Sequence, residues 1–336
     1  MEDTINEKDS MDESIYYKFS VDDLITMNPE ASILKEQYHQ LAAEKGICHI
    51  PVEDKKKSGL DIRKLLRDAA VLAINNKIQN LNVSSRKFTS IDNEAQAQSS
   101  LAVLTDIMDH YKYYLDDADY LEANLVRVQC IKEEAQRNSD FYQKEAEDRL
   151  ERKGLFRLNK NVEQTFDTLQ KQFEGYRMEL YLFAYATFLE VMLSQSFDGQ
   201  YLDDTIRLLR NYAYRYRDVY SECYKQLESY QRSAVESQVL KAGAGVSHIL
   251  GKGIARIPVI NKGPVDEKLI ELGDSISDYD EKQIQKGMEN FRKNKESGMN
   301  VFIENLIIVK TLCNNTGELL WDEEYLYVKK PVVVVS

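Results

Sequence analysis

The stretch MELYLFAYATFLEVML, residues 178–193, comes nearest to an uninterrupted apolar run in this sequence. Glu179 and Glu190 interrupt it, and it falls short of the roughly 18 apolar residues that a membrane-spanning helix needs. A helix that is apolar around its whole circumference, without crossing a membrane, is usually buried inside a bundle. The stretch therefore predicts a helix at the centre of a helical bundle.

The sequence on both sides of this run has the composition of long helices. Only 5 Pro and 14 Gly occur among 336 residues, whereas Glu, Lys, Gln, Leu and Ala are abundant. Helical periodicity predicts long helices over residues 94–115, 118–152, 161–196, 202–238 and 281–315. We expect Gly287 and Gly298 to bend the last of these. Helices of this length predict an all-α fold, an elongated antiparallel bundle with a short β-like C-terminal tail.

Both ends of the chain depart from the long-helix pattern. The predicted divisions are residues 1–19, 20–93, 94–320 and 321–336. The first is acidic and predicted to be disordered, the second is a small helical region, and the third is the long-helix bundle. The last is an extended tail, because YLYV and PVVVV have the β-branched and alternating character of short strands.

Net charge and cysteine usage limit the class of protein. A formal net charge of −12 disfavours general binding to nucleic acid, because a polyanion is repelled by most of such a surface. The 4 Cys are far apart and form no CxxC motif, which fits a reducing compartment. The acidic N-terminus lacks the apolar core of a secretory signal. We therefore expect a cytoplasmic location, with peripheral attachment to a membrane left open.

No motif in the sequence specifies catalysis. The histidines do not pair at metal-ligand spacing, and no G-x-S-x-G or comparable nucleophile pattern occurs. Asp117-x-Asp119 resembles the start of a calcium loop, but Leu121 stands where the next oxygen ligand belongs. The sequence predicts a protein that is not an enzyme and that holds no cofactor and no metal.

Tyrosines at helical spacing form a ladder, Tyr212, Tyr216, Tyr220 and Tyr224, interleaved with arginines. Aromatic and arginine side chains together could stack nucleobases. The acidic net charge makes packing against neighbouring helices the better interpretation, with the hydroxyl groups reaching water or polar partners.

The stretch LKAGAGVSHILGKGIARIPVINKG, residues 240–263, is the main functional clue. No acid occurs from residue 237 to 265, in an otherwise acidic chain. As a helix, it places cations on one side and aliphatic residues on the other, which suits anionic headgroups and acyl chains. Packing of this helix into its own bundle is the alternative. The predicted membrane- or partner-binding residues are Lys241, Val246, His248, Leu250, Lys252, Ile254, Arg256 and Ile257.

The glycines of this stretch weaken the helix, so that it needs a covering surface to become ordered. The arrangement resembles the glycine-rich insertion elements of helical pore-forming proteins, although no motif specific to that family occurs. The resemblance implies a helix that can leave its bundle and insert into a membrane. A Walker A phosphate loop is rejected, because Lys252 is followed by Gly253 where Ser or Thr is required.

A second basic patch lies in KKKSGLDIRKLLR. It comprises Lys55, Lys56, Lys57, Arg63, Lys64 and Arg67. It could bind phosphate groups of lipids or another polyanion, but a solvated loop and helix start is the more ordinary interpretation.

The sequence thus predicts a non-enzymatic helical protein that associates with an anionic lipid surface, or with a protein partner, through residues 239–262. The alternative is a soluble intracellular scaffold or adaptor that uses its tyrosine-rich helix faces or its C-terminal strand. Neither interpretation includes nucleic acid, and self-association into a homo-oligomer is left open.

Overall fold

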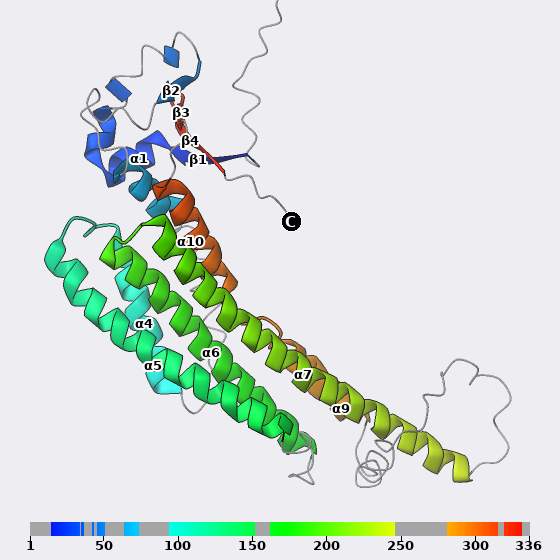
Figure 1. Ribbon diagram of the computed structural model, residues 1–336. Coiled ribbons are helices and arrows are strands. Elements are labelled where there is room, and N and C mark those ends of the chain that lie inside the picture. The colour runs from blue at the N-terminus through cyan, green and yellow to red at the C-terminus, as the bar shows by residue number, and fades with distance from the viewer. Residues whose placement is uncertain are drawn as a thin grey trace, which may run out of the picture. The chain divides into compact units, whose positions relative to one another are not determined.

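The computed structural model describes residues 15–33, 35–36, 42–43, 46–50, 64–73, 94–151, 162–245, 281–314 and 319–330. This part of the chain is predominantly helical and carries one small antiparallel sheet (Figure 1). The predicted all-α class, with a short strand region at the C-terminus, is therefore confirmed.

The helices fall close to the predicted ranges. They are α1 (Val21–Met27), the 3-10 turn η2 (Pro29–Ala31), α4 (Glu94–Tyr111), α5 (Ala118–Glu151), α6 (Val162–Ser194), α7 (Gly199–Gly245), α9 (Glu281–Arg292) and α10 (Asn300–Cys313). Residues 64–73 are also helical. Ser20 caps α1 as its capping pattern implies, because its hydroxyl accepts a hydrogen bond from the Asp23 amide at 3.4 Å.

The single helix predicted over 281–315 is wrong, because the structure forms α9 and α10 instead. Gly298 lies between them with φ of 80°, a left-handed conformation that glycine adopts without strain. Gly287 does not interrupt α9. A Cβ atom there would meet the ring of Phe166 on α6 at 2.8 Å, so this glycine permits close packing of α9 against α6.

Contacts divide the chain into two compact units. Unit 1 comprises Met1–Glu133, Leu182–Arg210 and Met299–Ser336, and unit 2 comprises Glu134–Tyr181 and Asn211–Gly298. The helices α5, α6 and α7 each contribute residues to both units.

Helices α5 and α6 run antiparallel. Lys132 of α5 pairs with Glu190 of α6 at 2.5 Å in unit 1. In unit 2 the Tyr176 hydroxyl of α6 donates to Gln143 of α5 at 3.5 Å. Asn138 of α5 hydrogen-bonds Glu179 of α6 in the same unit, so contacts within unit 2 move up one helix as they move down the other.

The apolar run at residues 178–193 includes the most completely buried part of the described structure. In unit 1, every residue from Leu182 to Leu193 is buried except Glu190, which is partly buried. Lys132 offsets the charge of that glutamate. The prediction of a helix buried on all sides within a bundle is confirmed.

The tyrosine ladder of α7 packs against neighbouring helices in unit 2, as predicted. Tyr216 is fully buried, and its ring meets Phe173 edge-on at 5.8 Å. Tyr220 stacks on Phe291 of α9 at 5.1 Å with an interplanar angle of 9°. These rings fill the space between α6, α7 and α9, and the Tyr216 hydroxyl is satisfied by donating to the Asn294 carbonyl.

The sheet combines strands from both ends of the chain within unit 1. The strands are β1 (Tyr16–Ser20), β2 (Cys48–Ile50), β3 (Leu319–Trp321) and β4 (Tyr325–Lys329), in the order β1-β4-β3-β2. All neighbours are antiparallel, with Tyr16 opposite Lys329 and Cys48 opposite Trp321. The predicted disorder of residues 1–19 is therefore wrong for 16–19, because the C-terminal strand β4 gives β1 a pairing partner distant in sequence.

The turn between β3 and β4 is organised by Asp322. Its carboxylate accepts hydrogen bonds from the amides of Glu324 at 2.8 Å and Tyr325 at 2.6 Å, and from the Tyr327 hydroxyl at 2.8 Å. An aspartate that accepts from the backbone two or three residues ahead is a standard turn former. This residue fixes the hairpin to which β1 and β2 then add.

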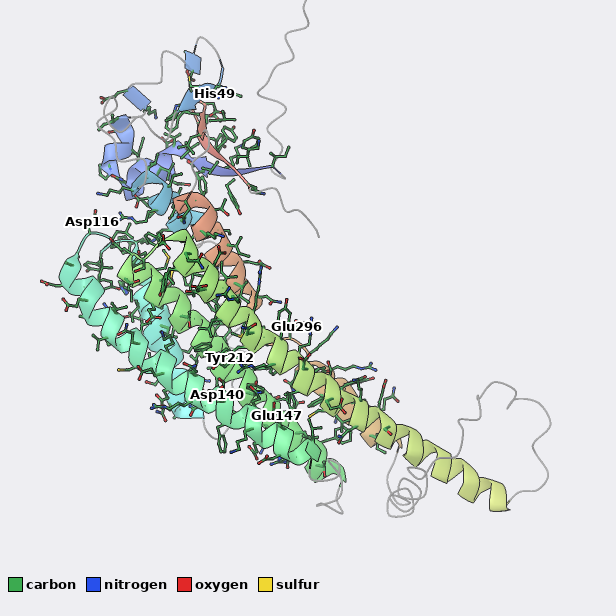
Figure 2. All side chains as sticks on the ribbon, in the orientation of Figure 1. His49, Asp116, Asp140, Glu147, Tyr212 and Glu296 are labelled. Atoms are coloured by element: carbon green, nitrogen blue, oxygen red, sulfur yellow. The ribbon has the colours of Figure 1, made fainter. Side chains whose placement is uncertain are left out.

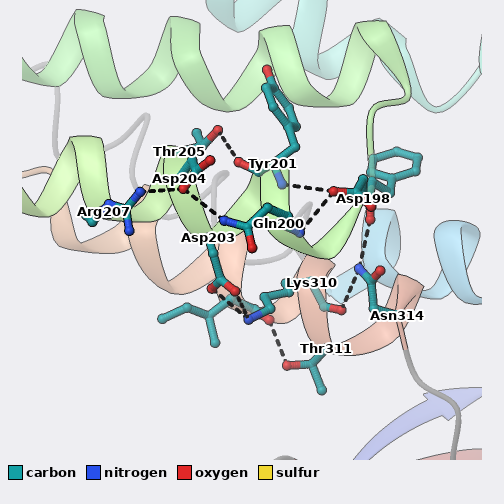
Figure 3. Close-up of polar contacts among 12 residues, drawn as sticks. Asp198, Gln200, Tyr201, Asp203, Asp204, Thr205, Arg207, Lys310, Thr311 and Asn314 are labelled. Atoms are coloured by element: carbon teal, nitrogen blue, oxygen red, sulfur yellow. Dashed lines mark hydrogen bonds and ion pairs between the residues drawn. The ribbon is translucent and has the colours of Figure 1, made fainter.

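The start of α7 is attached to α10 within unit 1 (Figure 3). Lys310 pairs with Asp203 at 2.6 Å, and the Asn314 amide donates to the Phe197 carbonyl at 2.7 Å. Asp198 caps α7 by accepting from the amides of Gln200 and Tyr201. These contacts hold α10, which leads to the sheet, against the first turns of α7.

Asn305 is a polar side chain in the apolar face of α10. It is 0% exposed, and neither its amide nitrogen nor its amide oxygen has a hydrogen-bond partner among the described residues. A buried polar group without a partner costs about 1–3 kcal/mol. We therefore expect Asn305→Leu to raise the free energy of unfolding by about 1–2 kcal/mol, as measured by urea denaturation.

The matched control is Asn300→Leu, at an exposed position of the same helix. We expect it to change stability by less than about 0.5 kcal/mol. Destabilisation by Asn305→Leu comparable to that of a core truncation would contradict this account.

Glu179 is a second polar group in a largely apolar setting, on α6 in unit 2. Burial raises the pKa of its carboxyl to about 7, the nearby Glu134 adds to this shift, and a hydrogen bond from Asn138 opposes it. The folded state therefore holds a proton on Glu179 that the unfolded state releases. Stability must fall as the pH rises from about 4.5 through about 7.

We expect Glu179→Gln to remove this part of the pH dependence. Relative to the wild type, the variant should gain about 1–2 kcal/mol more in free energy of unfolding at pH 8 than at pH 4. The expected value is modest because the carboxyl is only partly buried. Urea denaturation of the variant and the wild type at both pH values measures it. Asp167→Asn, at an exposed position of the same helix, is the control, and equal pH dependence in Glu179→Gln and the wild type would refute the assignment.

Candidate functional site

The predicted glycine-rich segment lies mostly outside the described residues. The structure describes the backbone of Val239–Gly245, which continues α7, and not the side chain of Lys241. The other predicted binding residues lie outside the described part: Val246, His248, Leu250, Lys252, Ile254, Arg256 and Ile257. The helix predicted to end at 238 is therefore longer and enters the cationic stretch.

The second basic patch is described in part. Lys55, Lys56, Lys57 and Arg63 lie outside the described residues, whereas Lys64 and Arg67 begin the helical segment 64–73. These two residues line a cleft of unit 1 with a volume of about 690 Å³. The other walls are the end of α1, residues 27–29, and the turn between α4 and α5, residues 112–117. Asp116 marks this turn in Figure 2.

The inner part of the cleft is a buried ion pair. The Arg67 side chain is 11% exposed and that of Asp68 is 1% exposed. Arg67 donates to Asp68 Oδ1 from Nε at 3.1 Å and from Nη2 at 3.0 Å, and Asn28 donates to Asp68 Oδ2 at 2.8 Å. Burial raises the pKa of Asp68, and the Arg67 charge and these hydrogen bonds oppose that shift. Asp68 thus fixes the orientation of the Arg67 guanidinium.

The mouth of the cleft holds a second carboxylate, Asp116, which forms ion pairs with two cations. Lys64 Nζ lies 2.9 Å from Asp116 Oδ2, and Arg67 Nη1 and Nη2 both lie 3.4 Å from Oδ1. The hydrogen bond from Lys64 lowers the pKa of Asp116. The Asp116 side chain is 64% exposed, so this pair is held far less firmly than the pair behind it.

The rim of the cleft is aromatic and cationic. Lys112 lies over the Tyr113 ring at 4.8 Å, and Tyr113 is 70% exposed. Tyr114 stacks on Tyr120 of α5 at 4.5 Å. An exposed ring beside cations offers a flat surface for part of a ligand.

The sequence indicated only part of this site. It singled out Lys64 and Arg67 as cations, but not Asn28 or Asp68, which position Arg67. Asp116 falls between the predicted helices 94–115 and 118–152. Its pairing with residues about 50 positions earlier depends on tertiary packing and leaves no local sequence signal.

Two other kinds of site are absent from the described part of the chain. No group of three or more His, Cys, Asp or Glu side chains could hold a metal ion among those residues. In the same residues, no helix is long and apolar enough to cross a membrane. Burial raises the pKa of the Cys313 thiol to about 12, which leaves it a poor nucleophile at neutral pH.

Comparison with known protein families, with curated proteins and with solved structures finds no match.

The two carboxylates of the cleft should differ strongly in their contribution to stability. Asp68→Ala leaves the guanidinium of a buried arginine without its main partner, so we expect a loss of about 3 kcal/mol. Asp116→Ala breaks an exposed pair and should cost less than about 1 kcal/mol. Thermal and urea unfolding of both variants measure the difference. Equal losses in the free energy of unfolding would contradict the account of Asp68 as the partner of a buried arginine.

Proposed function

We propose that this protein is a non-enzymatic helical protein that associates with anionic membrane surfaces through residues 239–262. The observation that carries the proposal is the course of α7, which extends to Gly245 and so enters the acid-free cationic stretch as a helix. A helix that continues from a packed bundle into a cationic, aliphatic and glycine-rich sequence has the properties of an interfacial element.

The energetics are consistent with this role. Gly243, Gly245, Gly251 and Gly253 each lower helix stability by about 0.8–1 kcal/mol relative to alanine. Each lysine or arginine near an anionic leaflet contributes about 1 kcal/mol to binding. The segment therefore gains both order and charge neutralisation at a lipid surface. A stronger form of the proposal, in which the helix leaves the bundle and perforates the membrane, would add leakage of vesicle contents.

The alternative function, a scaffold or adaptor, has less support. The tyrosine face of α7 is used inside unit 2, where Tyr212, Tyr216 and Tyr220 are buried. The C-terminal strand proposed for a partner, PVVVV at residues 331–335, lies outside the described residues. One of the two surfaces proposed for a partner is thus largely used in internal packing.

Co-sedimentation with vesicles tests the proposal. We expect the protein to pellet with phosphatidylcholine vesicles that contain phosphatidylserine and not with phosphatidylcholine alone. The triple variant Lys241→Gln, Lys252→Gln, Arg256→Gln should bind at least about tenfold more weakly, because three cations are removed from the lipid surface.

The control removes the same charge elsewhere. Lys225, Lys286 and Lys295 are exposed lysines of unit 2, and the triple variant with glutamine at each should bind like the wild type. Equal loss in both triple variants would indicate general charge attraction. Equal absence of the wild type from both vesicle pellets would refute the membrane function.

A further inference from the structure

We propose that the cleft around Arg67 binds the phosphate monoester group of a ligand, with Arg67 and Lys64 holding oxygen atoms at the place of the Asp116 carboxylate. The site lies in unit 1 and uses no residue of the segment 239–262. It is therefore independent of the membrane association proposed above.

The Arg67 guanidinium is held in one orientation before any ligand binds. Asp68 holds the Nε and Nη2 side of the guanidinium at 3.0–3.1 Å, and Asn28 fixes the other oxygen of Asp68. A side chain already locked in place loses little conformational entropy when a ligand arrives. A planar guanidinium oriented by a buried carboxylate is also the group best suited to recognise phosphate oxygens.

The hydrogen bonds at the outer edge of the Arg67 guanidinium are long. Nη1 and Nη2 both point to the single atom Asp116 Oδ1, each at 3.4 Å. Charge-assisted hydrogen bonds between such groups are usually about 2.7–2.9 Å long. The carboxylate thus under-uses the two donors that face the mouth of the cleft. A tetrahedral phosphate presents three oxygens, enough to accept from both Nη atoms and from Lys64 Nζ.

The Asp116 carboxylate can be displaced at little cost in free energy. Its side chain is 64% exposed, it lies on the turn between α4 and α5, and exposed ion pairs contribute only about 0–1 kcal/mol. The position between Lys64 and Arg67 already accommodates an anion in the form of this carboxylate. A phosphate monoester, which carries nearly two negative charges at neutral pH, interacts more strongly with the same two cations.

The rim adds to the binding of the rest of the ligand. Lys112 is a third cation of the lining, and the exposed Tyr113 ring lies beside it. Asp117, the remaining acid of the lining, is engaged elsewhere. Its carboxylate accepts from the Tyr120 amide at 3.0 Å and so caps α5. With Asp116 displaced, the described lining holds three cations, Lys64, Arg67 and Lys112, against the two carboxylates Asp68 and Asp117.

The competing explanation is that Lys64, Arg67, Asp68 and Asp116 form a purely structural ion network. The two explanations differ in the expected effect of Asp116. If the network is only structural, then removing the Asp116 carboxylate should not strengthen phosphate binding. If Asp116 occupies a phosphate position, then its removal should strengthen phosphate binding.

The experiment is calorimetric titration of the full-length protein with phenyl phosphate at pH 8, where the monoester is a dianion. We expect Asp116→Asn to bind about fivefold more tightly than the wild type, and Lys64→Met about fivefold more weakly. Both positions are at least partly exposed, so both variants should fold. The variant Arg67→Lys keeps the charge but loses the fork of donors, and it should also weaken binding.

The matched controls come from a similar ion pair outside the cleft. Asp203 and Lys310 of unit 1 are 53% and 36% exposed and lie 2.6 Å apart. Asp203→Asn and Lys310→Met change the net charge as the test variants do, and they should leave the affinity for phenyl phosphate unchanged. The triple variant of the segment 239–262 should also bind phenyl phosphate like the wild type, which separates this site from the membrane proposal.

A vesicle arm distinguishes a lipid headgroup from a soluble phosphate ester. In the background of that triple variant, Asp116→Asn should increase pelleting with phosphatidic acid vesicles, but not with phosphatidylserine vesicles, if the natural source is a lipid monoester. An effect confined to phenyl phosphate assigns a soluble ligand. The proposal is overturned if neither probe binds, or if Asp116→Asn fails to bind either probe more tightly than Asp203→Asn does.

Discussion

The structure depends on the burial of one helix on all sides. The residues of α6 from Leu182 to Leu193 present apolar surface around the whole circumference, and the fold covers every face of them except at Glu190. Burial of a single large apolar side chain contributes about 1.5–3 kcal/mol, so this run outweighs any polar contact in unit 1. Antiparallel neighbours joined by short connections provide the cover, which is why the chain forms long helices on both sides of α6.

The polar residues within these helices follow from that constraint. Glu190 stays partly exposed and meets Lys132, and Asp68 is buried only together with Arg67 and Asn28. Asn305 has no such arrangement among the described residues, so it represents a local cost that the surrounding packing of α10 outweighs. Whether a polar side chain stabilises this fold therefore depends on its partner more than on its depth.

Periodicity predicted the helices and the buried role of residues 178–193, because both are local properties of the sequence. It predicted the packing of the tyrosine ladder for the same reason. It did not predict β1, since a strand of five residues is defined by its pairing with β4 at the other end of the chain. At Gly298 it predicted a bend within one helix, whereas the structure ends α9 before this glycine and begins α10 after it. In the cleft, two cations were recognised from composition, whereas their orientation by Asp68 and Asp116 is a property of tertiary structure alone.

An acidic protein can still recognise anions, because charge acts over a short range in physiological salt. The Debye length is about 8 Å at physiological ionic strength, so most of the net charge of −12 is screened from any one surface position. What a ligand senses is the local arrangement of charges. At Arg67 this arrangement is a guanidinium oriented by the buried Asp68, with Lys64 nearby and the exposed Asp116 carboxylate paired with both cations. An internal anion at such a place keeps the cations from attracting unrelated polyanions, and a dianion with better geometry can still replace it.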